Sequence, residues 1–313
     1  MAVKKHIVTF LKLVVSLGGL AFVFWKIPFG EVSSHWTLRA LPWLLVILAA
    51  TFASMLVQAN RWRGLLLEEG KKIRLRTFYA YIALGYFFNN LLPGGFGGDA
   101  VKTLAFGKRF GQTAQSVAAV AVSRIMGLLA MFLCFFIALP AVFTGHEIPA
   151  LYTGVICTCS VLAILGVFAS LFLDKIKFPE FVVNKLKFIP KLQGAFSVYR
   201  GHKKAFMLSG LDSVWLQIFS IIIHYSYFRA VGLTVDLATI TVFTAITVTI
   251  TMLPISINGI GIRENVQVSL YSGLLGMPAD LVLASTLIGY VPLLFQAVQG
   301  AFVFATQKKL ASS

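Results

Sequence analysis

Long apolar stretches separated by short polar stretches make up most of the chain. Six of them are long enough to cross roughly 30 Å of hydrocarbon as helices that rise about 1.5 Å per residue. These predicted spans are residues 7–27, 40–60, 115–142, 148–173, 205–229 and 279–306. The pattern therefore predicts an all-α polytopic membrane protein.

Two further apolar segments, 77–92 and 238–257, run into stretches rich in Pro and Gly. The first reads NNLLPGGFGGDAVK at 89–102 and the second reads LPISINGIGIRE at 253–264. Backbone groups in hydrocarbon must be hydrogen-bonded, and Pro with several Gly cannot continue a helix, so we predict that both stretches face a protein interior or a wet cavity. The residues assigned to the helix breaks are Pro93, Gly94, Gly95 and Pro254.

Two readings of these segments remain open. In the first, each segment enters the membrane, breaks and returns as a re-entrant hairpin, which gives six full spans plus two hairpins. In the second, each segment crosses fully, and most loops would stay on the same sides.

Composition agrees with a membrane protein. The chain has 313 residues, of which 58% are hydrophobic and 12% charged, a balance too apolar for a soluble domain. The net charge of +16 would favour a nucleic-acid partner in a soluble protein. Under the hairpin reading, however, 21 of the 27 Lys and Arg residues lie on the side of both termini, four lie on the other side, and Lys12 and Arg124 lie within spans. This bias predicts the cytoplasmic (inner) membrane, both termini cytoplasmic and no nucleic acid.

The hairpin reading also reveals an internal repeat within a single integral membrane domain. Helix, helix, broken hairpin and helix follow one another in residues 1–146 and again, with the opposite orientation, in residues 147–313. Pro93 and Pro254 lie 161 residues apart, and a cation follows nine residues after each. Two inverted repeats with broken helices are typical of secondary transporters, and a chance match is the alternative.

Charged residues next to the breaks are candidates for contact with a ligand. Asp99 starts a predicted helix, where it caps free N–H groups or pairs with Lys102 three residues later; Lys102 pairs with Asp99 or reaches a lipid phosphate. Arg263 and Glu264 are adjacent and point about 100° apart on a helix, so we expect them to be poor partners for each other. At least one should then pair elsewhere or with substrate.

Arg124 lies well inside a predicted span, where a cation costs roughly 2.5 to 3.5 kcal/mol. Asp99, Glu264 or a lipid phosphate would compensate it, and the alternative is extension of the side chain to the cytoplasmic interface. Asp212 and His224, in the span 205–229, are expected to be packed polar or interface residues.

Glycine and asparagine complete the candidate site. Glycine lets backbone N–H groups approach a ligand, and a helix that begins after the glycines directs its positive end towards an anion. Turn formation is the alternative role for the asparagines. The full set of candidate substrate-binding residues is Asn89, Asn90, Gly97, Gly98, Asp99, Lys102, Arg124, Asn258, Gly259, Gly261, Arg263 and Glu264.

Catalytic chemistry is not indicated. The chain has no His cluster, no paired aspartates at metal-ligand spacing and no Gly-x-Ser-x-Gly motif. We therefore expect no enzyme activity, no metal and no cofactor.

With LPGGFGGDAVK, the Arg124 span, SVYRGHKK and LPISINGIGIREN, the chain resembles the lysylphosphatidylglycerol synthase transmembrane-region family, also called the flippase-like domain family. The likeness extends over nearly the whole chain. The family shows Leu-Pro followed by Gly-Gly-Asp in its first half and Gly-Gly-x-Gly-x-Arg-Glu in its second, with Asn258 here where glycine is frequent. The matching residues are Gly97, Gly98, Asp99, Gly259, Gly261, Arg263 and Glu264.

The resemblance implies a lipid flippase or scramblase for an anionic phospholipid or a polyprenyl-phosphate-linked lipid, with substrates that differ between members. It also implies homodimerisation, which the sequence itself does not indicate. The chain lacks the soluble aminoacyl-transferase domain of the synthases, so lipid lysylation by this polypeptide is not expected. A membrane enzyme of lipid modification and an accessory subunit of a lipid synthase are the alternatives.

The chain departs from the family near its end. Many relatives carry an Arg in the last helix, whereas LIGYVPLLFQAVQGAFVF has only Tyr290, Gln296 and Gln299 as polar residues. This difference puts in doubt a substrate with the charge pattern of aminoacyl phosphatidylglycerol.

Overall fold

The structure is a computed structural model of the whole chain. It describes residues 29–91, 97–143, 189–252, 256 and 258–310, together with short pieces at 17–18, 20–22, 24–25, 27, 154, 156–162 and 164–165. The predicted spans 7–27 and 148–173 therefore lie largely outside the described residues. The predicted break residues Pro93, Gly94, Gly95 and Pro254 also lie outside them.

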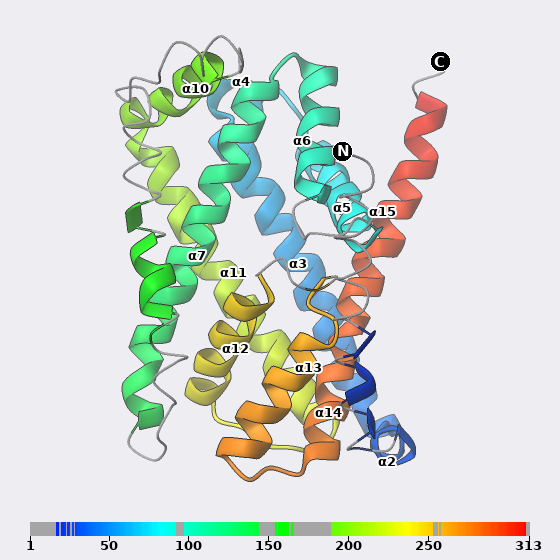
Figure 1. Cartoon of the computed structure of the whole chain (residues 1–313). Coiled ribbons are helices and arrows are strands. Elements are labelled where there is room, and N and C mark those ends of the chain that lie inside the picture. The colour runs from blue at the N-terminus through cyan, green and yellow to red at the C-terminus, as the bar shows by residue number, and fades with distance from the viewer. Residues whose placement is uncertain are drawn as a thin grey trace.

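All secondary structure in the described ranges is helical (Figure 1). The first half contains α2 (Phe29–Ser34), η1 (Leu38–Ala40), α3 (Leu41–Leu65), α4 (Leu67–Lys71), α5 (Leu75–Leu91), α6 (Gly97–Phe110) and α7 (Thr113–Phe143). The second half contains α10 (Ile189–Gly201), α11 (Lys203–Ala230), α12 (Leu237–Thr251), α13 (Ile262–Gln267), the π-helix η3 (Val268–Leu274), α14 (Ala279–Ile288) and α15 (Tyr290–Leu310).

Four helical stretches are long and apolar enough to cross a membrane. They are Leu38–Leu65, Thr113–Val142, Lys203–Ala230 and Ala279–Thr306, and they correspond to four of the six predicted spans. The protein is thus an all-helical, multi-pass membrane protein. The last of these stretches is divided, because α14 ends one residue before Gly289 and α15 begins one residue after it.

Gly289 permits a close approach at this division. A methyl group there would lie 2.8 Å from the Thr286 carbonyl oxygen and 3.4 Å from the Tyr227 ring on α11. Gly300 has the same role further along α15, where a methyl group would lie 2.1 Å from the Ala83 carbonyl oxygen of α5. Small residues at such crossings let backbones approach closely within a membrane.

The helices pack in a definite pattern. Helix α3 packs along α11, α5 packs on both α6 and α15, and α12 packs on both α7 and α13. Figure 1 shows α6 in the same half of the bundle as α4 and α10, whereas α13 and η3 lie in the opposite half. Each of the two short helices α6 and α13 begins close to the middle of the bundle.

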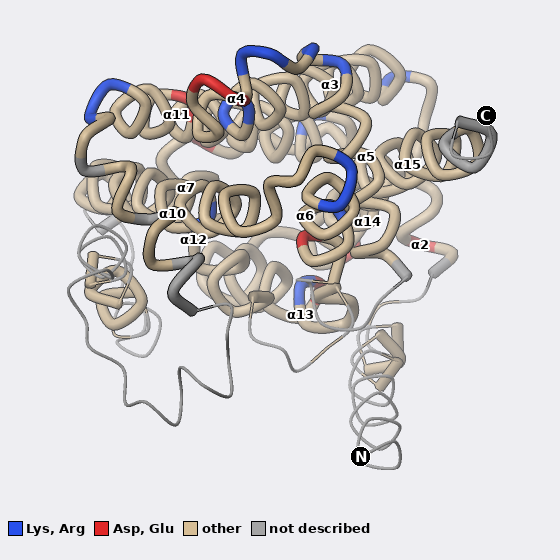
Figure 2. The backbone as a smooth tube through the Cα atoms, turned by 90° about the horizontal axis from the view of Figure 1, so that it is seen from above, with Lys and Arg blue, Asp and Glu red and all other residues tan. Residues whose placement is uncertain are grey.

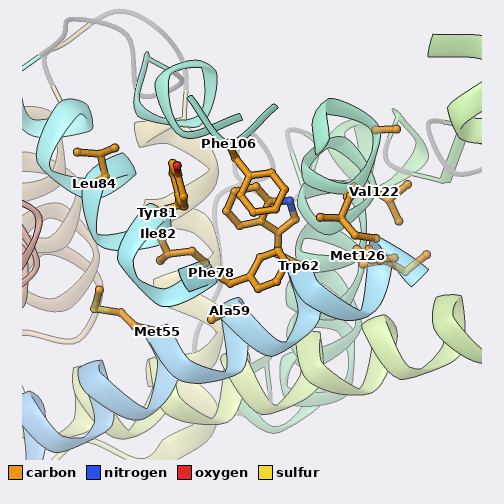
Figure 3. Close-up of a cluster of buried hydrophobic side chains, with 14 of the residues drawn as sticks. Met55, Ala59, Trp62, Phe78, Tyr81, Ile82, Leu84, Phe106, Val122 and Met126 are labelled. Atoms are coloured by element: carbon orange, nitrogen blue, oxygen red, sulfur yellow. The ribbon is translucent and has the colours of Figure 1, made fainter. Parts of the chain in front are cut away.

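Aromatic side chains hold α3, α5 and α6 together (Figure 3). The Trp62, Phe78 and Phe106 rings lie with centroids 5.0 to 5.4 Å apart, and Tyr81 meets Phe106 at 5.4 Å. These four side chains are almost fully buried. Such ring pairs add specific geometry to the apolar contact, so they fix α6 against the end of α3.

Basic residues gather at one end of the bundle, which Figure 2 views face on. This end carries the α4–α5 connection, the end of α6 and the start of α11. The exposed cations in these places are Lys71, Lys72, Arg74, Arg76, Lys108, Arg109, Lys203 and Lys204.

Candidate functional site

A cavity of about 390 Å³ opens between α3, α5, α6, α7 and α11. We call it the cationic cavity, because three of its lining side chains are cations and one is a carboxylate. Its charged and polar lining residues are Gln58, Arg61, Trp62, Tyr86, Asn89, Asn90, Asp99, Lys102, Ser123, Arg124, Gln217 and Asn258. The charged residues come from three helices, so the cavity depends on tertiary packing.

Asp99 is the centre of an ion triad. Its carboxylate lies 2.5 Å from the Lys102 ammonium, one turn further along α6, and 2.5 Å from Nη2 of Arg124, which reaches it from α7. Arg124 Nε also donates to Asp99 at 2.7 Å. The Asp99 and Lys102 side chains are each 13% exposed. Arg124, whose side chain is 42% exposed, is therefore compensated by Asp99, one of the three partners predicted for it.

Arg61 is the third cation of the cavity. The sequence placed it after the end of the predicted span, among the loop cations, but α3 continues to Leu65 and carries Arg61 within the bundle. Its Nη1 donates to the Ser213 hydroxyl of α11 at 2.8 Å. The i, i+3 spacing of Gln58 and Arg61 on one helix face was the available indication of this role.

Lys102 also lies over the aromatic cluster. Its ammonium is 5.6 Å from the centre of the Trp62 ring, within the range of a cation–π contact. The cluster of Figure 3 thus positions a functional side chain as well as filling the core.

Asn89 caps the start of α6. Its Oδ1 accepts a hydrogen bond of 2.7 Å from the Gly98 backbone N–H, so the free N–H group is satisfied by α5 and the Asp99 carboxylate is available for its two cations. Gly98 itself packs on Gly85, because a methyl group at Gly98 would lie 1.8 Å from the Gly85 carbonyl oxygen. Glycine is therefore required at position 98 because α5 and α6 pack closely there.

At the second break, positive φ angles explain the residue types. Asn258 has φ of +50°, Gly259 +76° and Gly261 +80°, a region in which glycine is favoured and asparagine is tolerated. Gly261 is the N-cap of α13, and its N–H donates to Glu264 at 2.7 Å.

Glu264 and Arg263 contact each other, contrary to the prediction from their adjacency. The Arg263 guanidinium approaches Glu264 Oε1 at 3.4 Å and lies 4.6 Å from the centre of the Tyr290 ring, while the Tyr290 hydroxyl donates to the same oxygen at 2.8 Å. The Arg side chain is long enough to turn back across the first turn of α13. Glu264 is fully buried, so Tyr290, at the division of the last span, completes the network.

The two breaks meet inside the bundle. Asn258 Nδ2 donates to Asn90 Oδ1 at 3.0 Å, and Asn90 Nδ2 donates to the Leu293 carbonyl oxygen of α15 at 3.3 Å. The asparagines thus join the end of α5 to the segment before α13, about half the chain away, in addition to any role in local turns.

A second cavity, of about 420 Å³, lies on the other side of this contact. We call it the hydroxyl cavity, because Ser, Thr and Tyr side chains contribute much of its lining. Its polar lining residues are Thr51, Ser54, Gln58, Tyr86, Ser220, His224, Tyr227, Thr247, Thr251, Asn258, Arg263, Gln267, Thr286 and Gln296. Six residues line both cavities: Gln58, Tyr86, Leu216, Val248, Asn258 and Leu293.

The sequence was compared with known protein families. The lysylphosphatidylglycerol synthase transmembrane region matches residues 9–300, nearly the whole chain. The chain belongs to this family. Comparisons with curated proteins and with solved structures found no match. Family membership makes this a lipid-related membrane protein, and the matched range includes every lining residue of both cavities.

The predicted site residues of this family member separate into two groups. Asn89, Asn90, Asp99, Lys102 and Arg124 line the cationic cavity, Asn258 lines both cavities and Arg263 lines the hydroxyl cavity. Five predicted residues line neither cavity: Gly97, Gly98, Gly259, Gly261 and Glu264. For Gly98, Gly259, Gly261 and Glu264, the described contacts and φ angles account for the residue type without a ligand.

Several lining residues escaped the sequence-based prediction. His224 was expected near the outer interface, but it lines the hydroxyl cavity and its Nδ1 contacts the Ser220 carbonyl oxygen at 2.8 Å. Asp212 lines neither cavity and accepts from Asn60 Nδ2 at 3.4 Å between α11 and α3, as a packed polar residue would. Tyr86, Gln217 and Gln296 lie in apolar helices where a single polar residue had no distinguishing spacing.

A metal centre is not formed by the part of the chain that the structure describes, where no three His, Cys, Asp or Glu side chains come together. The two cavities offer Arg, Lys, amide and hydroxyl groups, together with the Asp99 carboxylate and the His224 imidazole. These groups bind phosphate and hydroxyl-bearing ligands.

Proposed function

We propose that the protein moves an anionic phospholipid, or a polyprenyl-phosphate-linked lipid, between the leaflets of the inner membrane without changing it chemically. The cationic cavity carries this proposal. Arg61, Lys102 and Arg124 face it with Asp99 as the carboxylate among its lining residues, so it has an excess of positive charge. Cations at this depth are costly, and a lipid phosphate would offset that cost while its acyl tails stay in the bilayer.

The packing pattern supports two inverted repeats, 1–146 and 147–313. In this arrangement α3 corresponds to α11, α5 to α12, and α7 to the α14–α15 pair. The contact of α5 with α15 then has its counterpart in the contact of α12 with α7. Likewise, α6 against α7 corresponds to α13 against α14. The contact of α3 with α11 then corresponds to itself, as expected along a pseudo-two-fold axis.

Aromatic residues repeat in the same way. In the first half Trp62, Phe78 and Phe106 form a cluster, and in the second half Phe228 and Phe243 pack on Tyr271 at 4.6 and 4.9 Å. Each member of the second set follows its counterpart by 165 or 166 residues (Trp62 to Phe228, Phe78 to Phe243, Phe106 to Tyr271). Two related hairpins that meet at Asn90 and Asn258 would form the moving parts of alternating access.

The basic end of the bundle supports the orientation. The eight exposed cations gathered there, and the end of α15 at the same end in Figure 1, fit a cytoplasmic face with a cytoplasmic C-terminus. In this orientation the cationic cavity is nearer the cytoplasm and the hydroxyl cavity nearer the outer face.

Lys102→Gln tests the proposal. We expect the variant, reconstituted in vesicles, to move a labelled anionic phospholipid about ten- to a hundredfold more slowly than the unmodified protein, because one charge-assisted phosphate contact is lost. The unmodified protein gives a second test, since it should move a zwitterionic lipid much more slowly than the anionic one. Mass spectrometry of the recovered lipids should show unchanged masses, whereas a lipid-modifying enzyme would alter them.

The matched control is Lys108→Gln. Lys108 lies on the same helix but is exposed at its basic end, so the same charge is removed outside the cavity. Equal rates for Lys102→Gln and the unmodified protein, or equal losses in both variants, would contradict a role of the cationic cavity in headgroup binding.

A further inference from the structure

The hydroxyl cavity differs in its chemistry from the cationic cavity. Fourteen of its twenty lining residues are polar, and Arg263 is the one among them that carries a permanent charge. That charge is already met by Glu264 at 3.4 Å and by the Tyr290 ring. The hydroxyl cavity therefore offers many hydrogen bonds and little net charge, so a second phosphate is a poor fit.

Most of its hydroxyl groups present oxygen acceptors. Thr51, Thr247 and Thr251 each donate to the carbonyl oxygen four residues earlier, at 2.7 to 2.9 Å, and Ser54 donates to the Thr51 carbonyl oxygen at 2.8 Å. Thr286 donates to Gln267 at 2.6 Å. A hydroxyl that has used its proton keeps its lone pairs, so these five oxygens favour a ligand rich in hydrogen-bond donors.

A ligand could supply these donors as hydroxyl groups or as an ammonium group. The charges around the hydroxyl cavity favour hydroxyl groups. An ammonium group would meet Arg263, and the nearby Glu264 is fully buried and already bonded to Gly261 and Tyr290. Asn258, Gln58 and Gln296 add amide groups that donate to and accept from hydroxyls. A polyol can form hydrogen bonds with both the hydroxyl oxygens and the side-chain amides of this cavity.

The two cavities are neighbours that share six lining residues. Tyr86, which donates to Gln58 at 2.9 Å, faces both cavities, as does Asn258. One headgroup that passes the shared side chains would place its phosphate in the cationic cavity and the neighbouring part in the hydroxyl cavity. Each volume is within the usual range for small-molecule sites, about 300–1,000 Å³.

We infer that the hydroxyl cavity binds the uncharged, hydroxyl-rich part of the headgroup, so that the transported lipid is a phospholipid with a polyol or sugar headgroup. The inference rests on the proposed function and names its substrate class. It assigns Thr247, Thr286 and Gln296 to selection of the headgroup and leaves recognition of the phosphate to the cationic cavity.

Competing headgroups on identical acyl chains test this inference. In vesicles of phosphatidylcholine that contain the reconstituted protein, we expect labelled phosphatidylinositol to move at least about tenfold faster than phosphatidylserine or phosphatidic acid, since several hydrogen bonds distinguish them. Thr247→Val, which removes one acceptor and keeps the side-chain shape, should slow phosphatidylinositol about two- to tenfold and leave phosphatidic acid unchanged. Gln296→Leu, on another helix, should act in the same direction.

Thr249→Val is the matched control. Thr249 lies two residues further along α12, is also buried and makes the same bond to the carbonyl oxygen four residues earlier, but it lines neither cavity. Equal rates for all three anionic lipids, faster movement of phosphatidylserine, or equal effects of Thr247→Val and Thr249→Val would overturn the inference and leave the proposed function standing. Movement of no lipid at all would contradict the proposed function and the inference together.

Discussion

The Asp99→Asn variant should lose about 3–5 kcal/mol of stability, because it removes the one carboxylate that bridges Lys102 and Arg124 inside the bundle. Breaking a buried ion pair leaves the remaining charge without compensation, and here two cations would face each other beside Arg61. The thermal unfolding midpoint of the purified protein in detergent measures the loss.

A second substitution tests the cause of this loss. Asp99→Asn combined with Lys102→Gln removes one of the repelling cations, so the double variant should unfold at a higher temperature than Asp99→Asn alone. Glu69→Gln is the matched control, since Glu69 and Lys72 form an ion pair with the same spacing in an exposed position, and its loss should leave the midpoint unchanged. An unchanged midpoint in Asp99→Asn would contradict a stabilising contact of Asp99 with its two cations.

The Glu264→Gln variant should be similarly costly, with a loss of about 3–5 kcal/mol. Glu264 is fully buried and accepts hydrogen bonds from the Gly261 N–H and the Tyr290 hydroxyl, so the neutral amide would replace an acceptor with a donor and leave Arg263 without its carboxylate. Thermal unfolding in detergent again measures the effect.

Tyr290→Phe separates the charge from the hydrogen bond. It removes one hydroxyl and keeps the ring that lies under Arg263, so its cost should be nearer 1 kcal/mol. Glu31→Gln, an exposed acid on α2, is the control for loss of a negative charge. Equal midpoints for Glu264→Gln and Glu31→Gln would show that the Arg263 network contributes nothing.

Hydrophobic length was enough to predict four described spans, because a helix that crosses hydrocarbon must be apolar for about 20 residues. The i, i+3 spacing of Asp99 and Lys102 likewise indicated their pairing, and the cost of a cation within a span indicated that Arg124 needs a partner. These are local or single-residue arguments, and they need no knowledge of the packing.

The remaining features depend on how the helices meet. Arg61 lay past the end of the apolar pattern, yet α3 continues and turns it towards Ser213 of α11. The contact of Arg263 with Glu264 depends on the reach of a long side chain, which the angle between adjacent helix positions does not describe. The two cavities and the contact between Asn90 and Asn258 arise from helices far apart in the sequence.

The location of a bound lipid phosphate tests the central claim most directly. An experimental density map of the purified protein with phosphatidylinositol should place the phosphate in the cationic cavity, within hydrogen-bonding distance of Lys102 and Arg124 and near Arg61. A phosphate bound instead at the exposed cations of the basic end, with the cationic cavity free of lipid, would contradict the account.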